Sequence, residues 1–176
     1  DIYFQTREAV NSYYTALPEI VENYMNEINK IYQKHVSNEL KLVTDPNHAI
    51  LNKDKVKTKT LAFLCELGKV GEEAKVFSFW DSSSTDSKEL MDCYIDGLHM
   101  LMSIGFELHV DNLKNYQEIS DSKDITDQLI KVYQSALKVI DTYTFEAFQN
   151  CIDDYFTLGF KIGLDFDTIL QNYSNN

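Results

Sequence analysis

The chain has 176 residues, of which 16 are Lys or Arg and 28 are Asp or Glu, so its formal net charge is −12. This length favours one domain, and an apolar fraction of 44% with 12% aromatic residues is enough for a packed core, which excludes wholesale disorder. Six Gly and two Pro are too few turn signals for a β-sandwich or barrel, and so acidic a chain, with Arg7 as its one arginine, is a poor ligand for nucleic acid.

Apolar residues recur at helical spacing along almost the whole chain, in blocks that short polar breaks separate. In chain order, the predicted helices cover about residues 18–40, 54–76, 87–106, 125–140, 145–162 and 166–173. The main breaks are 44–54, 81–86 and 112–124, and Ser84 or Thr85 is expected to cap the helix at 87–106. No segment alternates with the period of a strand. The sequence therefore predicts an all-α helical bundle, as a single domain over residues 1–176.

The cysteines and the hydropathy pattern bear on the compartment. Cys65, Cys93 and Cys151 lie far apart in the sequence, which favours buried free thiols over a disulfide framework or a zinc site. No stretch of about 18 uncharged apolar residues is present, and no basic-then-apolar leader is visible. These patterns predict a soluble, cytoplasmic protein with no membrane contact.

Two predicted helices carry acidic faces interleaved with apolar residues. The faces are Glu66, Lys69 and Glu73 on the first of them, and Asp92, Asp96 and His99 on the second. Carboxylates held close together repel unless a cation lies between them, and Mg²⁺ is the usual cation for oxygen ligands on facing helices. The alternative is that these residues are the ordinary charged flanks of amphipathic helices in an acidic protein. His99 has the same two interpretations, as a group that orients a carboxylate or ribose or as a satisfied residue at a helix interface.

Three blocks of the sequence resemble one family. Leu61–Gly68 (LAFLCELG) with Phe77–Trp80 (FSFW), Asp92–Met100 (DCYIDGLHM), and Tyr155–Gly163 with Phe166–Ile169 resemble segments of the all-α, dimeric dUTPases of Gram-positive bacteria and their phages. The blocks occur in the family's order and spacing over roughly the last two thirds of the chain.

The resemblance implies a helical bundle of the all-α nucleoside triphosphate pyrophosphatase type, related to MazG. Such enzymes hydrolyse dUTP, and often dUDP, to dUMP, with Mg²⁺ held by an ExxE and an ExxD motif on two helices. The resemblance also implies a homodimer, and it places Trp80 near the nucleotide.

Two of the four metal ligands that the family uses are changed here. Glu66 and Asp96 are present, but Lys69 stands at the second Glu of ExxE and Cys93 at the Glu of ExxD. An ammonium group repels Mg²⁺, and a thiol is a soft ligand for a hard cation. The nearest carboxylates that could compensate are Glu73 and Asp92. The family's basic C-terminal arm has no counterpart in this sequence.

Two hypotheses follow for the site. The first is a divergent dUTPase-like enzyme with Glu66 and Glu73 in catalysis. In this hypothesis the Mg²⁺ ligands are Glu66, Asp96, Glu73 and Asp92, and the substrate contacts are Trp80, Lys69 and His99. The second is a degenerate family member that binds a nucleotide or a protein partner without hydrolysis.

Overall fold

The computed structural model describes residues 27–76 and 85–175, and within these ranges the chain forms helices and loops without a strand. A helix at residues 27–40 comes first. It is followed by α2 (Lys53–Glu73), α3 (Ser87–Glu107), α4 (Ile125–Thr142), α5 (Phe145–Lys161) and α6 (Phe166–Asn175). The predicted all-α fold is confirmed, and the predicted ends of α2 to α6 lie within one helical turn of the observed ends. The start of the first predicted helix lies outside the described residues.

The helices begin at side chains that accept backbone N–H groups. Asn52, Asp124 and Thr144 cap α2, α4 and α5 in this way. The predicted cap of α3 is wrong: Ser84 lies outside the described residues, and Asp86 rather than Thr85 occupies the capping position. The Asp86 carboxylate accepts from two backbone N–H groups, at 3.0 and 3.1 Å, and the helix begins at Ser87, the residue that the sequence predicted.

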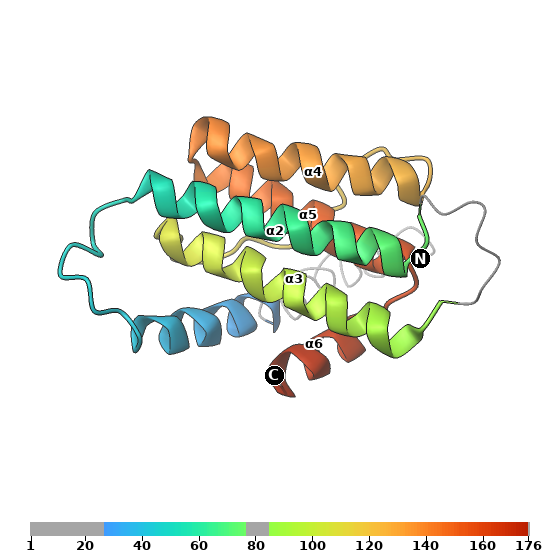
Figure 1. Cartoon of the computed structure of the whole chain (residues 1–176), viewed down its shortest axis with the longest axis horizontal. Helices are drawn as coiled ribbons and strands as arrows, with labels where there is room; N and C mark the ends of the chain where they lie inside the picture. The colour runs from blue at the N-terminus through green and yellow to red at the C-terminus, as the bar shows by residue number, and fades with distance from the viewer. Residues whose placement is uncertain (1–26, 77–84, 176) are drawn as a thin grey trace, which may run out of the picture.

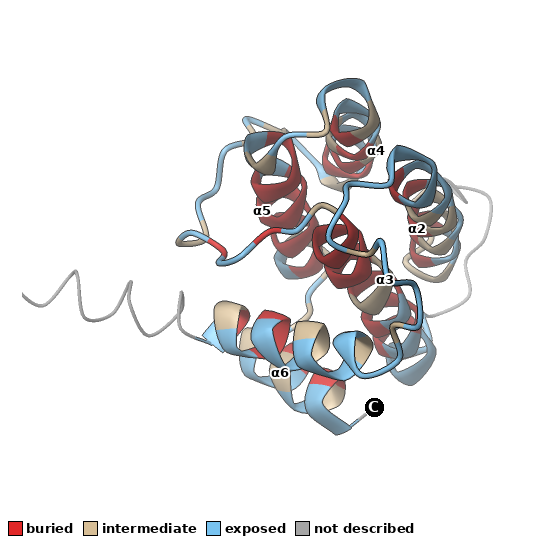
Figure 2. Cartoon of the chain, turned by 90° about the vertical axis from the view of Figure 1, so that its left-hand side faces the viewer, coloured by how far each residue is buried: buried red, intermediate tan, exposed pale blue. Residues whose placement is uncertain are grey.

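Helices α2 to α5 surround a common core, and the helix at 27–40 and α6 lie together along the α3 side of the bundle (Figure 1). The end-on view shows that burial is concentrated on α3 and α5, the two helices with neighbours on most sides (Figure 2). Helix α3 is therefore held in place by its core side chains. Its polar residues lie on the face that points toward α2, α6 and the helix at 27–40.

Two tyrosines join α3 to α5 in a reciprocal contact. The rings of Tyr94 and Tyr155 stack at 4.4 Å, nearly parallel, and each hydroxyl donates to the other residue's backbone carbonyl, at 2.9 and 2.7 Å. Each ring covers a glycine of the opposite helix, Tyr155 over Gly97 and Tyr94 over Gly159. Both tyrosines are completely buried, and a Cβ at either glycine would come within 2.6 Å of a tyrosine hydroxyl oxygen, so a side chain there would displace a buried ring.

The thiols are free, as the sequence predicts, but they are not all buried. Cys93 and Cys151 lie in the core, whereas Cys65 is exposed. Cys65 lies on α2 between half-buried residues and near Tyr133 of α4, so the expectation of a buried thiol at this position is wrong.

A polar layer on α5 supports the loop that connects α3 to α4. Asp153, only 3% exposed, accepts a hydrogen bond from Gln149 at 3.2 Å, and Gln149 also accepts one from the backbone N–H of Lys114. Burial raises the pKa of Asp153 to about 7, with a further increase from neighbouring Asp154, although hydrogen bonds from Gln149 and the Gln117 backbone oppose the shift.

We expect this carboxyl to make stability depend on pH. Because the folded protein binds this proton more tightly than the unfolded chain, stability from this group is present at low pH and falls as pH rises toward 7. Between pH 5.5 and 8 the loss is about 2 kcal/mol. Urea unfolding at pH 5.5 and pH 8 measures the free energy of unfolding at each pH. The Asp153→Asn variant should not show the loss of about 2 kcal/mol that this carboxyl causes in wild type. An unchanged difference between the two pH values in the variant would contradict the assignment.

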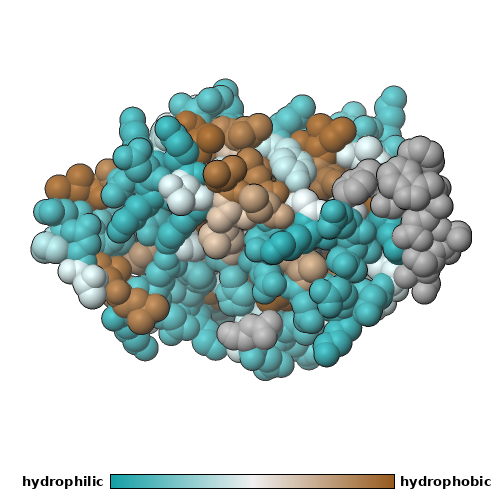
Figure 3. All heavy atoms as spheres, viewed as in Figure 1, coloured by the Kyte–Doolittle hydropathy of each residue, from teal (hydrophilic) through white to brown (hydrophobic). Residues whose placement is uncertain are grey.

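Apolar side chains remain exposed on the face where α2 and α4 lie side by side, and they form a visible patch there (Figure 3). The large hydrophobic side chains that are exposed on these helices are Leu61, Ile130 and Leu137. Within residues 27–76 and 85–175, none of the helices is apolar enough over a sufficient length to cross a bilayer.

Candidate functional site

The acidic faces of α2 and α3 meet where the two helices pack together. A Cβ atom at Gly97 would lie 3.8 Å from the Cβ of Glu66, so the stem of Glu66 rests against the α3 backbone one residue after Asp96. This is an ordinary van der Waals distance, whereas the same Cβ would clash with the Tyr155 hydroxyl oxygen, so it is the Tyr155 ring that requires glycine here. The spacing of the two sequence motifs thus brings Glu66 and the turn that carries Asp96 together.

Glu66 has an unusual environment for a carboxylate. Its side chain is 22% exposed, and Oε1 accepts a hydrogen bond from Lys69 Nζ at 3.2 Å. Oε2 is buried and has no hydrogen-bond partner. A buried, unpaired carboxylate oxygen is costly, because it has lost its hydration and gained nothing in return. It is therefore the atom of this site that is best suited to a cation.

Lys69 supplies a positive charge at the rim. Its side chain is 61% exposed, and its hydrogen bond and ion pair with Glu66 raise the pKa of its ammonium group, with smaller contributions from Cys93 and Asp96. The residue that replaces the second Glu of ExxE therefore pairs with the first Glu.

Cys93 lies within electrostatic range of four carboxylates, here called the carboxylate ring. Burial is the main cause that raises the pKa of its thiol, and the nearby negative charges raise it further. Those charges belong to Glu89, Glu73, Asp96 and Glu66. The thiol is therefore neutral at physiological pH, and it does not act as an anionic ligand in the way that a Glu would.

The compensating carboxylates that the sequence suggested differ in position. Glu73 is half-buried and acts on Cys93, whereas Asp92 is exposed, as Asp96 is one turn later on the same face of α3. Glu89, one turn before Cys93, takes part in the carboxylate ring, and sequence reasoning missed it. Its spacing of four residues from Cys93 and seven from Asp96 is the signal that could have identified it.

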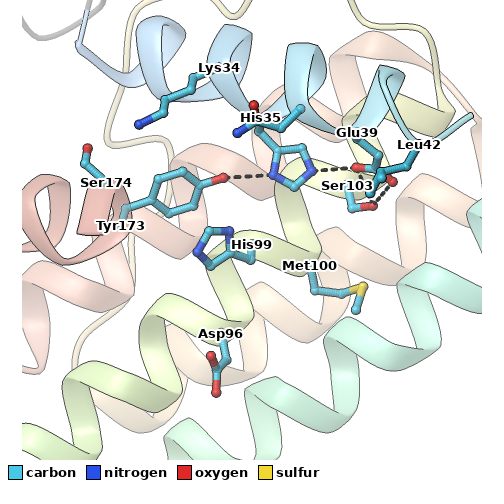
Figure 4. A pocket seen from close by; sticks show the side chains of 11 residues that line it. Lys34, His35, Glu39, Leu42, Asp96, His99, Met100, Ser103, Tyr173 and Ser174 are labelled. Carbon is cyan, nitrogen blue, oxygen red and sulfur yellow. Dashed lines mark hydrogen bonds and ion pairs between the residues drawn. The ribbon is translucent and has the colours of Figure 1, made fainter. Parts of the chain in front are cut away.

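Asp96 also lines a pocket of about 490 Å³ between the helix at 27–40, α3 and α6 (Figure 4). His99 follows one turn later on α3, Lys34 and His35 come from the first helix, and Tyr173 comes from α6. The pocket therefore begins next to the carboxylates and extends away from them along α3. His99, which was a candidate substrate contact, lies in this pocket, while Trp80 lies outside the described residues.

Part of the pocket wall is a charged cluster that the sequence did not suggest. The Glu39 carboxylate interacts with His35 Nε2 at 2.6 Å, with Lys59 Nζ at 2.5 Å and with Ser103 Oγ at 2.7 Å. Lys59 also pairs with buried Glu107 at 2.8 Å. Burial opposes ionisation of Glu39, but its three hydrogen bonds lower its pKa to about 2. Glu39 is therefore ionised and holds His35 in a fixed orientation.

Among the residues that the structure describes, no group of three or more His, Cys, Asp or Glu side chains is arranged to hold a metal ion by itself. Mg²⁺ in nucleotide-dependent enzymes is commonly held by one or two carboxylates together with substrate phosphates. Glu66, with its unpaired oxygen, and Asp96 fit that kind of site, and they do not fit a complete protein cage.

Comparison with known proteins identifies one family over most of the chain. The family model described as dUTPase matches residues 27–176. Pyruvate-flavodoxin oxidoreductases of Klebsiella pneumoniae and Enterobacter agglomerans are each 61% identical to the chain over 31 residues. That stretch is 18% of this chain and spans 3% of either oxidoreductase, so the match gives no information about the activity of this chain. No solved structure matches the chain.

Proposed function

The chain belongs to the dUTPase family, and from this premise we propose that it is a magnesium-dependent pyrophosphohydrolase that converts dUTP or dUDP to dUMP. The observation that carries the proposal is the buried, unpaired Oε2 of Glu66 beside the α3 turn that bears Asp96. A bound cation would satisfy this oxygen, and this would explain why the native fold keeps a buried carboxylate oxygen without a hydrogen-bond partner.

Glu66 and Asp96 would hold the ion, with Glu73 and Glu89 adding negative charge from the surrounding ring. When bound, Mg²⁺ would neutralise the negative charge on the phosphate oxygens. Glu66 and Glu73 orient the attacking water by accepting its hydrogen bonds, and the Lys69 ammonium contacts a phosphate oxygen. Asp92 is exposed, as Asp96 is, and lies one turn before it on α3, so it would add a further carboxylate to the site.

The nucleoside part of the substrate would lie in the pocket that Asp96 shares. A volume of about 490 Å³ falls in the range of small-molecule sites, and the pocket opens from the carboxylates that would hold the phosphate end. His99 and the first helix supply the polar and aromatic groups of its walls.

A second candidate function is nucleotide binding without hydrolysis. The observations that favour it are the ion pair between Lys69 and Glu66 and the neutral thiol of Cys93. An ammonium group already beside the carboxylate lowers the electrostatic attraction for a second cation.

A homodimer forms part of the proposal. The exposed apolar patch on α2 and α4 is of the kind that a second copy of the chain covers in a symmetric interface.

The direct test is release of pyrophosphate from dUTP by the full chain. We expect dUMP and pyrophosphate to form with Mg²⁺ present and no turnover after chelation with EDTA. Calorimetry with a non-hydrolysable dUTP analogue, run in parallel, measures binding separately. Binding of the analogue without pyrophosphate release would contradict the enzyme proposal and support the second candidate.

A further inference from the structure

The pocket beside Asp96 contains an aromatic side chain from α6. The Tyr173 ring stacks on the His99 ring at 4.1 Å with an angle of 22° between the planes, and its hydroxyl lies 3.0 Å from His35 Nδ1 (Figure 4). Tyr173 is 5% exposed. One flat ring thus makes both a stacking contact and a directed hydrogen bond with the pocket walls.

The hydrogen-bond polarity at His35 follows from its other neighbour. Because the Glu39 carboxylate is ionised, His35 Nε2 donates to it at 2.6 Å, and in the uncharged imidazole this makes Nδ1 the acceptor. Burial, and to a lesser degree the charge of Glu39, raises the pKa of Tyr173, so its hydroxyl stays protonated and donates to Nδ1.

The stacking surface is also defined. Burial lowers the pKa of His99, and the neighbouring His35 lowers it further, against a smaller opposing effect of Asp96. His99 therefore presents an uncharged imidazole face. Together the two histidines make a slot that selects a planar ring with a hydrogen-bond donor at its edge.

Helix α6 is held weakly in comparison with the bundle. It has ten residues, of which Ile169 and Tyr173 are the buried ones, and it packs mainly on α3. It follows a turn at Gly163, whose φ of 91° suits glycine. An element with so little buried surface opens at low cost compared with the core helices.

We propose that Tyr173 occupies the subsite of a planar heteroaromatic ring that carries an N–H donor, and that such a ligand must displace Tyr173 to bind. This inference rests on the proposed function, in which the ligand is a nucleotide whose base has an imide N–H. His35 Nδ1 accepts from that N–H in place of the tyrosine hydroxyl, and His99 stacks on the base. Tyr173 then acts as a built-in competitor that lowers the apparent affinity for the nucleotide.

The test is calorimetric titration of the full chain and two variants with dUMP, without Mg²⁺. Tyr173→Phe keeps the ring and loses the hydrogen bond, and we expect dUMP to bind about fivefold tighter. Tyr173→Ala removes both contacts, and we expect binding at least about tenfold tighter. Tyr116→Phe, which removes a hydroxyl bonded to Thr157 of α5 and lies outside the pocket lining, is the matched control and should leave dUMP affinity unchanged.

Tighter binding by the Tyr173 variants supports the proposal, whereas unchanged or weaker binding makes Tyr173 a fixed wall of the pocket and overturns it. Hydrogen exchange gives a second measurement: the amides of residues 166–175 should exchange faster in wild type when dUMP is added, and slower exchange overturns displacement. If neither wild type nor any variant binds dUMP, the nucleotide pocket itself fails, and the proposed function fails with it.

Discussion

Glu66→Gln is expected to lower Mg²⁺-dependent hydrolysis of dUTP by about 100-fold or more. The substitution keeps the size of the side chain but removes the charge from the oxygen that is buried and unpaired. The amide also brings a donor, which repels a cation. Initial rates of pyrophosphate release at saturating Mg²⁺ measure the effect, and thermal unfolding checks that the variant retains the fold.

Glu72→Gln is the matched control for this substitution. It makes the same chemical change on the same helix, but at an exposed position outside the proposed site. We expect its turnover to stay close to that of wild type. A Glu66→Gln variant with turnover within about twofold of wild type would mean that the acidic faces are surface charge, as the structural alternative holds.

Gly159→Ala is expected to destabilise the protein by about 2–4 kcal/mol. A Cβ atom at this position would lie 2.6 Å from the Tyr94 hydroxyl oxygen and 2.7 Å from its Cζ. Tyr94 cannot move aside, because its ring is stacked on Tyr155 and its hydroxyl is bonded to the Tyr155 carbonyl. Calorimetry should show a melting temperature lower by roughly 5–15 °C.

Gly68→Ala provides the comparison, since it is also a glycine within a helix. Its Cβ would meet nothing closer than the Tyr133 hydroxyl at 3.4 Å. Alanine is the better helix former, so we expect unchanged or slightly higher stability. Similar melting temperatures for the two variants would contradict the close packing of the Tyr94 ring on Gly159.

The helices could be predicted from the sequence because their signals are local. Apolar spacing and the polar breaks define α2 to α6, and capping residues lie next to the elements that they begin. The Ser84 and Thr85 error arose from the same local reasoning, since three adjacent residue types can all cap a helix and only the backbone path selects Asp86.

The site could be predicted only in part. Helical spacing places Glu66, Glu73 and Asp96 on the faces where the structure has them, because those faces are properties of single helices. The cluster of Glu39 with Lys59 and the contact of His35 with Tyr173 join residues that are 20 and 138 positions apart. No periodicity encodes such pairs, so they become visible only when the helices are packed.

The reciprocal tyrosine contact restricts where the molecule can move. With each ring bonded to the backbone of the opposite helix, α3 and α5 cannot slide or rotate independently of one another. Asp96 precedes Gly97 on this rigid pair, so its position is constant while ligands enter and leave. The motion that admits a ligand must therefore come from the peripheral helices, and an intramolecular cross-link between α3 and α5 would leave ligand exchange unaffected while one that fixes α6 to α3 would slow it.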